Sequence, residues 1–70
     1  MTNKELNRIR VVLAERNKKN KWLADELGKN QATVSQWCNN MRQPSIETLY
    51  EIAKVLDVDI RQLINPTKEI

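Results

Sequence analysis

Histidine is absent from the 70-residue sequence, and cysteine occurs only once. Zinc and iron–sulfur sites require several Cys or His ligands, so the sequence excludes both kinds of metal site. The same absence removes the general base of Ser–His–Asp and Cys–His nucleophilic sites. We therefore expect a protein with no metal, no cofactor, no small-molecule substrate and no enzymatic activity.

Long apolar runs are also missing. The longest is Val11–Ala14, whereas a membrane-spanning helix needs roughly 18 apolar residues. The opening MTNKELNRIR lacks the apolar core of a secretory signal. A lone cysteine has no partner for an intrachain disulfide, which favours a reducing compartment. These features predict a cytoplasmic protein that does not insert into membranes.

Phenylalanine is absent, glycine occurs once and proline twice, and apolar residues recur at spacings of three and four. This periodicity predicts an all-α fold. We expect the first helix to begin at a capping box formed by Thr2 and Glu5 and to run to about Arg16. Its buried face would consist of Leu6, Ile9, Val12 and Leu13.

Two short helices follow, separated by a tight turn. The second helix would include Trp22 to Leu27 and would end at Gly28, which provides a left-handed C-cap. Asn30 is a good N-cap for a third helix over residues 31–39. Two short helices joined by a three-residue turn containing Gly are typical of a helix-turn-helix, whose second helix enters the major groove of DNA.

Two more helices are expected after residue 44. Ser45 would cap the first, and Asp59 with Gln62 would cap the second, which Pro66 closes. The predicted buried stripe of the first consists of Ile46, Leu49, Ile52, Ala53 and Leu56, and the second would run through Ile60, Leu63 and Ile64. We predict one helix-turn-helix domain over residues 1–64 and a C-terminal tail over residues 65–70.

The helix over residues 31–39 has one polar face. If Val34 points to the core, Trp37 and Cys38 lie beside it, and we assign both a structural role. The opposite face carries Ala32, Gln36 and Asn39, flanked by Thr33 and Ser35. Such amide, hydroxyl and methyl groups can pair with adenine edges, bind phosphate oxygens or contact a thymine methyl. A plain solvated face is the alternative interpretation.

The net charge of +3 is unevenly distributed. Residues 1–42 carry nine Lys and Arg against four Asp and Glu, whereas residues 43–70 carry three against five. Four lysines bracket the predicted second helix and the turn, where they could neutralise phosphates: Lys18, Lys19, Lys21 and Lys29. We therefore expect the basic part of the chain to face a polyanion and the acidic part to face away from it.

The sequence resembles the helix-turn-helix domain of the Cro and phage-repressor family, also called the XRE family, over the stretch WLADELGKNQATVSQWCNNMRQPSIETLYEIAKVLDVDIRQLI. Four motifs occur in the family's order: LA…LG, VSQW, PSIETL and LDVD. The resemblance implies a compact five-helix bundle of the lambda-repressor-like type. It also implies sequence-specific binding to double-stranded DNA by a transcriptional regulator, with repression as the commoner outcome.

The resemblance further implies a homodimer on a pseudo-palindromic operator, because one short helix reads too few base pairs. The interface candidates are Val58, Ile60, Ile64 and Ile70, whose alternative role is to close the small core. A different function stays open as well. The domain could be a protein-interaction module, such as an antitoxin-like subunit, in which DNA binding is secondary.

The family's contacts carry over to this sequence by position. Base contacts fall on Gln31, Ala32, Thr33 and Gln36. Phosphate contacts fall on Asn20, Asn39, Asn40 and Arg42, to which the charge pattern adds Lys19, Lys21 and Lys29. Lys19 stands where the family usually has Thr or Ser, so the second helix would be capped by Asn17 or Asn20 or lack a cap. Asn40 stands where the family usually has glycine, and Asn tolerates a positive φ better than most residues.

Overall fold

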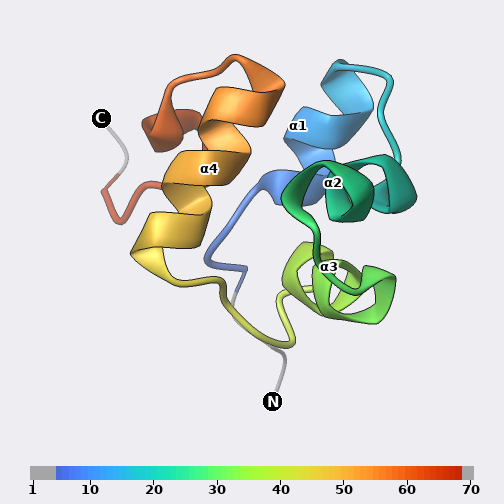
Figure 1. The fold of residues 1–70 in the computed structure, drawn as a ribbon. Coiled ribbons are helices and arrows are strands. Elements are labelled where there is room, and N and C mark those ends of the chain that lie inside the picture. The colour runs from blue at the N-terminus through green and yellow to red at the C-terminus, as the bar shows by residue number, and fades with distance from the viewer. Residues whose placement is uncertain (1–4, 69–70) are drawn as a thin grey trace.

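The computed structural model describes residues 5–68 and is helical throughout its core (Figure 1). The elements are α1 (Ile9–Glu15), α2 (Asn20–Leu27), α3 (Gln31–Cys38), α4 (Ile46–Leu56) and the 3-10 helix η1 (Ile60–Leu63). Within residues 5–68 the only β pairing is an isolated antiparallel bridge between Asn7 and Ile64. The predicted all-α class is confirmed, although the fifth helical segment is a 3-10 helix. No helix in this range is long and apolar enough to cross a bilayer.

Apolar side chains from all five helical segments share one core. α2 packs against α3 and α4, while α1 packs against α3 and η1. One residue from each segment is 0% exposed: Ile9, Leu23, Val34, Ile52 and Leu63. Truncating such a residue to Ala typically costs about 2–5 kcal/mol, so each segment is firmly tied to the bundle.

The caps of the last two helices form as predicted. Ser45 Oγ accepts a hydrogen bond from the backbone N–H of Thr48 at 3.1 Å at the start of α4. Asp59 and Gln62 form a reciprocal capping box at the start of η1. In both cases the side chain satisfies N–H groups that the first helical turn leaves without a partner.

Two apolar residues after position 44 depart from their predicted positions, Ile46 in a buried stripe and Ile64 in the last helix. Ile46 is 54% exposed because the first turn of α4 lies at the edge of the bundle (Figure 1). Ile64 is 41% exposed and extended, with φ −125° and ψ 136°, because the chain has left η1 and pairs with Asn7. Helical periodicity alone does not reveal where neighbouring elements stop covering a helix.

The predicted start of the first helix is wrong. α1 begins at Ile9, and Thr2 of the predicted capping box lies outside the described residues. Residues 5–8 run as a non-helical segment beside the chain that follows η1, where Asn65 N donates to Leu6 O at 3.0 Å. This pairing between distant parts of the chain replaces the local helical hydrogen bonds, and it leaves Leu6 50% exposed.

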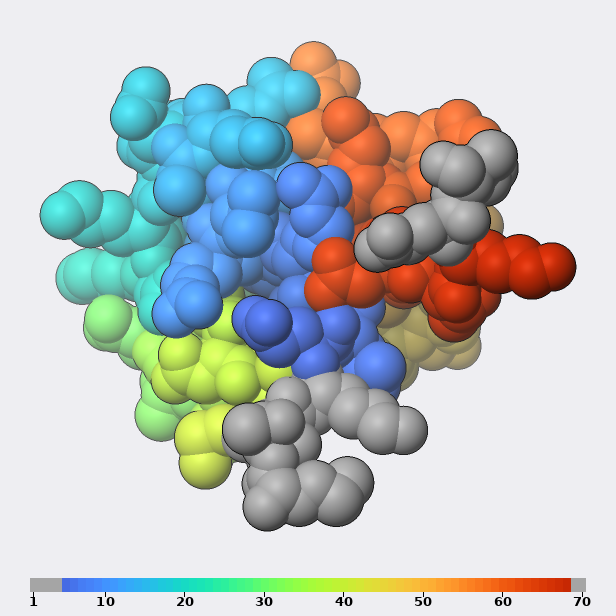
Figure 2. Space-filling view, turned by 180° about the vertical axis from the view of Figure 1, so that it is seen from behind, coloured from blue at the N-terminus to red at the C-terminus, as the bar shows by residue number. Residues whose placement is uncertain are grey.

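Two buried side-chain amides fix the other side of this segment. Asn7 is 6% exposed and Asn40 is 8% exposed. Asn40 Oδ1 accepts from the backbone N–H groups of Leu6 and Asn7, both at 2.9 Å. Asn7 Nδ2 donates to Trp37 O at 2.9 Å and to Gln43 Oε1 at 2.7 Å. We call Asn7, Asn40 and Gln43 the amide cluster. It joins residues 5–8 to the end of α3, and Figure 2 shows these two segments side by side.

Replacing Asn40 separates its two structural roles, because Asn40 also adopts a left-handed backbone with φ 59°. We expect Asn40→Gly to lose about 1–3 kcal/mol of unfolding free energy, since buried N–H groups lose their acceptor. Asn40→Ala should lose about 1 kcal/mol more, because a Cβ disfavours the left-handed conformation. Urea unfolding of both variants measures the difference. Equal stability of both variants and the wild-type protein would contradict these roles.

Cys38 is buried as predicted, with 4% of its surface exposed. Its thiol donates to Asn20 Oδ1 across a distance of 3.3 Å. Burial raises the pKa of the Cys38 thiol from 9.0 to about 11, and the positive charge of Arg10 opposes part of this rise. The native state therefore favours the neutral thiol, which is the unreactive form.

The raised pKa predicts a pH-dependent loss of stability. The Cys38 contribution should be complete below pH 9 and should decline as the pH approaches 11, because the unfolded chain releases the thiol proton first. Urea unfolding of the wild-type protein and Cys38→Ala across this range isolates the thiol from other titrating groups. The wild-type protein should lose stability relative to the variant as the pH rises, and a constant difference would rule the effect out.

Candidate nucleic-acid interface

The turn between α2 and α3 spans residues 28–30, as predicted. Gly28 has φ 65° and ψ 33°, the left-handed conformation that glycine adopts without strain. Asn30 Oδ1 accepts from Ala32 N at 2.7 Å and caps α3. Both helix ends are thus stabilised inside the turn, which fixes α3 relative to α2 in the helix-turn-helix arrangement (Figure 1).

α3 separates its core and solvent faces as its periodicity predicts. Val34 is 0% exposed and Trp37 is 6% exposed, so their predicted structural positions are confirmed. Of the four predicted base-contact residues, Gln31 and Ala32 are exposed and Thr33 and Gln36 are half-buried. All four come from one helix of eight residues, QATVSQWC, which contains no acidic side chain.

Asn20 joins the first turn of α2 to α3. Asn20 Nδ2 donates to Ser35 Oγ at 3.2 Å, while its Oδ1 accepts from the thiol of Cys38. The side chain is half-buried and bridges the two helices instead of capping α2. A phosphate contact by Asn20 would therefore use its backbone. Otherwise Asn20 would act only by positioning its neighbours.

The beginning of α2 combines basic side chains with backbone N–H groups. Within the described residues, Lys19 occupies the N-cap position with φ −113° and ψ 164°, and no side chain caps the helix. Of the alternatives for this cap, the missing cap is the one observed. Lys21 Nζ lies 3.2 Å from Asp25 in an ion pair whose side chains are 71% and 66% exposed. Such an exposed pair contributes only about 0–1 kcal/mol, so Lys21 can exchange this partner for another anion.

A half-buried tryptophan lies beside this basic region. Lys18 Nζ is 4.7 Å from the ring centroid of Trp22, a cation–π contact. Trp22 also packs against the core cluster from its edge. The ring therefore holds one lysine over the surface near the start of α2.

The remaining predicted phosphate contacts fall into two groups. Lys29, Asn39 and Arg42 are exposed around α3, where their side chains can reach a ligand. Asn40 is different, because its amide is turned into the protein and hydrogen-bonded there. Its backbone N–H is occupied as well, since it donates to Trp37 O at 3.1 Å. Asn40 is therefore better placed to shape the loop than to contact a phosphate directly.

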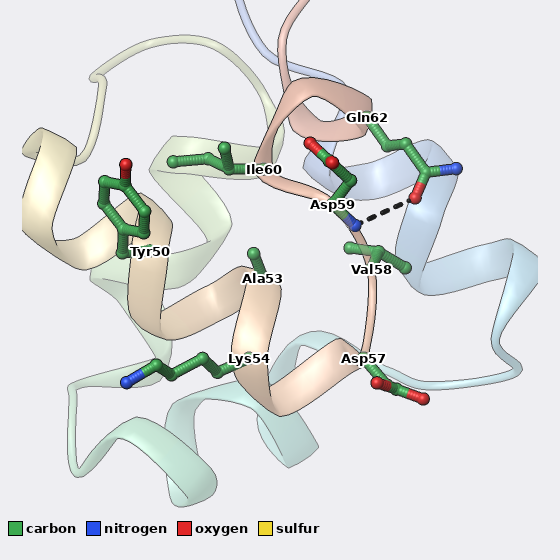
Figure 3. Close-up of a pocket in the computed structure, with 8 residues that line it drawn as sticks. All are labelled: Tyr50, Ala53, Lys54, Asp57, Val58, Asp59, Ile60 and Gln62. Atoms are coloured by element: carbon green, nitrogen blue, oxygen red, sulfur yellow. Dashed lines mark hydrogen bonds between the residues drawn. The ribbon is translucent and has the colours of Figure 1, made fainter.

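A second surface lies on the opposite, acidic half of the chain (Figure 3). α4 and the segment leading into η1 border a hollow of about 700 Å³, lined by Tyr50, Ala53, Lys54, Asp57, Val58, Asp59, Ile60 and Gln62. The interface candidates Val58 and Ile60 are half-buried in its wall. Ile64 is exposed beside a neighbouring hollow, and Ile70 lies outside the described residues.

Sequence reasoning missed the amide cluster. Asn7 falls within the expected first helix and Gln43 within the loop after the third, so residue type and spacing do not predict their hydrogen bonds. The available signal was Asn40 itself, because a glycine would satisfy the left-handed backbone without supplying an amide.

The chain is similar to a known protein family and to a protein of known structure. A family model described as "Helix-turn-helix" matches residues 9–63. A crystal structure from Bacteroides fragilis, described as that of a candidate DNA-binding protein, is 55% identical in sequence, with a TM-score of 0.85. The similarity covers 86% of this chain and 97% of that chain. No curated protein matches the chain. The matched family model and the α2–α3 geometry together show that this chain belongs to the XRE-type helix-turn-helix family.

Proposed function

We propose that this protein binds double-stranded DNA sequence-specifically and regulates transcription, acting as a cytoplasmic repressor without enzymatic activity or a cofactor. The observation that carries the proposal is the outer face of α3. It presents amide, hydroxyl and methyl groups without any acid, and the capped turn fixes its position beside α2. The DNA-binding description of the similar Bacteroides fragilis protein supports the same function.

Base recognition is assigned to α3 in the major groove. The Gln36 amide can donate and accept on an adenine edge, and Gln31 can do the same from the first turn. Ala32 and the methyl group of Thr33 can contact thymine methyl groups. The exposure of Gln31 and Ala32 and the partial exposure of the other two side chains support this assignment.

Phosphate contacts would orient α3 but would not select sequence. The uncapped start of α2 offers N–H groups and the positive end of the helix dipole, with Lys19 and Lys21 beside it. Lys29, Asn39 and Arg42 supply contacts around α3. Asn20 contributes by holding the start of α2 against α3. These groups precede and follow α3 in the sequence. Phosphate contacts on both edges of the groove would require groups on both sides of the recognition helix.

A homodimer would place two copies of α3 on a pseudo-palindromic operator. Successive major-groove half-sites lie about 34 Å apart. The molecule measures 35 × 28 × 23 Å, so two copies that meet along the longest axis would have their centres at about that spacing. Val58, Ile60 and Ile64 offer apolar surface on the acidic half of the chain. In this organisation residues 1–64 form the DNA-binding domain and residues 65–70 form a tail.

The salt dependence of binding to random duplex DNA tests the phosphate contacts. The logarithm of the binding constant should fall with the logarithm of salt concentration by about 0.9 per neutralised phosphate. Arg42→Ala should weaken binding to every sequence and flatten this slope by about one. Lys68→Ala, which removes a charge from the tail, is the matched control and should keep the wild-type slope. A wild-type response that is flat would instead favour the protein-interaction alternative.

Selection from random duplex DNA, followed by mutation of Gln36, tests base recognition. We expect a palindromic site to be recovered. Gln36→Ala should lose about 1–3 kcal/mol of binding free energy at that site and almost none on random DNA, because only the cognate base pairs with the amide. Titrations with both duplexes measure the two losses. Equal losses would mean that Gln36 contacts the DNA backbone only.

A further inference from the structure

Residues 5–8 lie between two parts of the chain that are far apart in sequence (Figure 2). On one side, Asn7 pairs with Ile64, and Arg8 N donates to Leu63 O at 2.8 Å. On the other side, Asn7 and Asn40 form the amide cluster with Gln43. The segment thus connects the end of η1 with the loop that follows α3.

The amide cluster is closed on itself. Gln43 accepts from Asn7 Nδ2 at 2.7 Å and donates through Nε2 to Asn40 Oδ1 at 3.1 Å. Asn40 Nδ2 donates back to Asn7 O at 3.2 Å. Among residues 5–68, no buried side-chain nitrogen or oxygen lacks a hydrogen-bond partner. The hydrogen bonds specify one arrangement of the buried Asn7 and Asn40 side chains, since another would leave buried groups unpaired, and the exposed Gln43 ties the loop to that arrangement.

The loop held by this cluster carries Arg42. Its backbone turns through the left-handed Asn40 and then folds back on α3, where Met41 N and Arg42 N donate to Gln36 O at 2.9 and 3.3 Å. The Arg42 side chain is exposed. The loop is consequently fixed at Gln36 on one side and at Gln43 on the other, with the proposed phosphate-binding residue between them.

We infer that Asn7, Asn40 and Gln43 are positioning residues that hold the loop 39–43 so that Arg42 is preorganised for a DNA phosphate. This inference rests on the proposed DNA binding. It adds residues that affect binding without contacting a base or a phosphate. A loop already fixed in its bound geometry loses less conformational entropy on binding. The Gln43 side chain is exposed and is not part of the core. Its two hydrogen bonds therefore act on the position of the loop.

A double-mutant cycle on random duplex DNA at low salt tests the inference. Gln43→Ala should weaken binding about threefold to tenfold, because it removes the two hydrogen bonds that tie the loop to Asn7 and Asn40. In an Arg42→Ala background the same change should weaken binding less than about twofold, because the loop then has no phosphate contact to position. Equal losses in both backgrounds, or no loss in either, would overturn the inference.

Asn65→Ala is the matched control. It removes a side-chain hydrogen bond to the same segment, from Asn65 Nδ2 to Glu5 O at 2.6 Å, on the side away from the loop. Its DNA affinity should stay within about twofold of the wild-type value, since loss of a hydrogen bond from residues 5–8 does not by itself displace Arg42. A loss as large as that of Gln43→Ala would show a general structural effect and would overturn the inference.

Hydrogen exchange supplies a readout that does not depend on DNA. The amide protons of Met41 and Arg42 should exchange about tenfold faster in Gln43→Ala and at the wild-type rate in Asn65→Ala. If the wild-type protein failed to bind DNA, the proposed function would fall while this measurement still judged whether the cluster fixes the loop. Unchanged exchange in Gln43→Ala would overturn the positioning role in either case.

Discussion

Asn7 and Asn40 occupy the point at which three distant parts of the chain meet. Their amides join residues 5–8 to the end of α3, and the backbone beside Asn7 pairs with the residues that follow η1. A small domain buries little apolar surface for each residue, so directional hydrogen bonds matter more to its uniqueness. Two apolar side chains at these positions could also be buried. They would not fix which backbone N–H groups lie opposite them, because an apolar side chain accepts no hydrogen bond.

The exposed face of α3 follows from two levels of constraint. Gly28 and Asn30 fix the direction of α3 through local backbone chemistry. Val34 and Trp37 then fix its rotation about its own axis, since both must enter the core. Once the direction and the rotation of α3 are set, the side chains opposite Val34 and Trp37 must face the solvent. The proposed recognition surface is thus a consequence of packing on the opposite side of the same helix.

Sequence reasoning predicted the features that depend on near neighbours. The caps at Gly28, Asn30 and Ser45 each involve groups within a few residues, so residue identity and spacing reveal them. The start of α1 could not be predicted in this way, because the competing partners of Leu6 and Asn7 lie 33 or more residues away. The same limit explains why Asn40 was assigned to phosphate by position, although its amide binds the N-terminal segment. Ile46 is a third case. Its helix is predicted correctly, but its side chain is exposed because it lies at the edge of the bundle.

The uneven charge also has a physical consequence for how the protein would approach DNA. Charges at a protein surface interact over about 8–10 Å at physiological salt, whereas the molecule extends 35 Å along its longest axis. The field beside a surface charge is therefore set mainly by its near neighbours, and the net charge of +3 does not describe the field around Lys18, Lys19 and Lys29. Encounter with a polyanion is governed by the local basic surface, and the acidic surface is repelled only when it turns toward the DNA. In the proposed complex with DNA, both effects would favour an orientation in which α3 faces the groove.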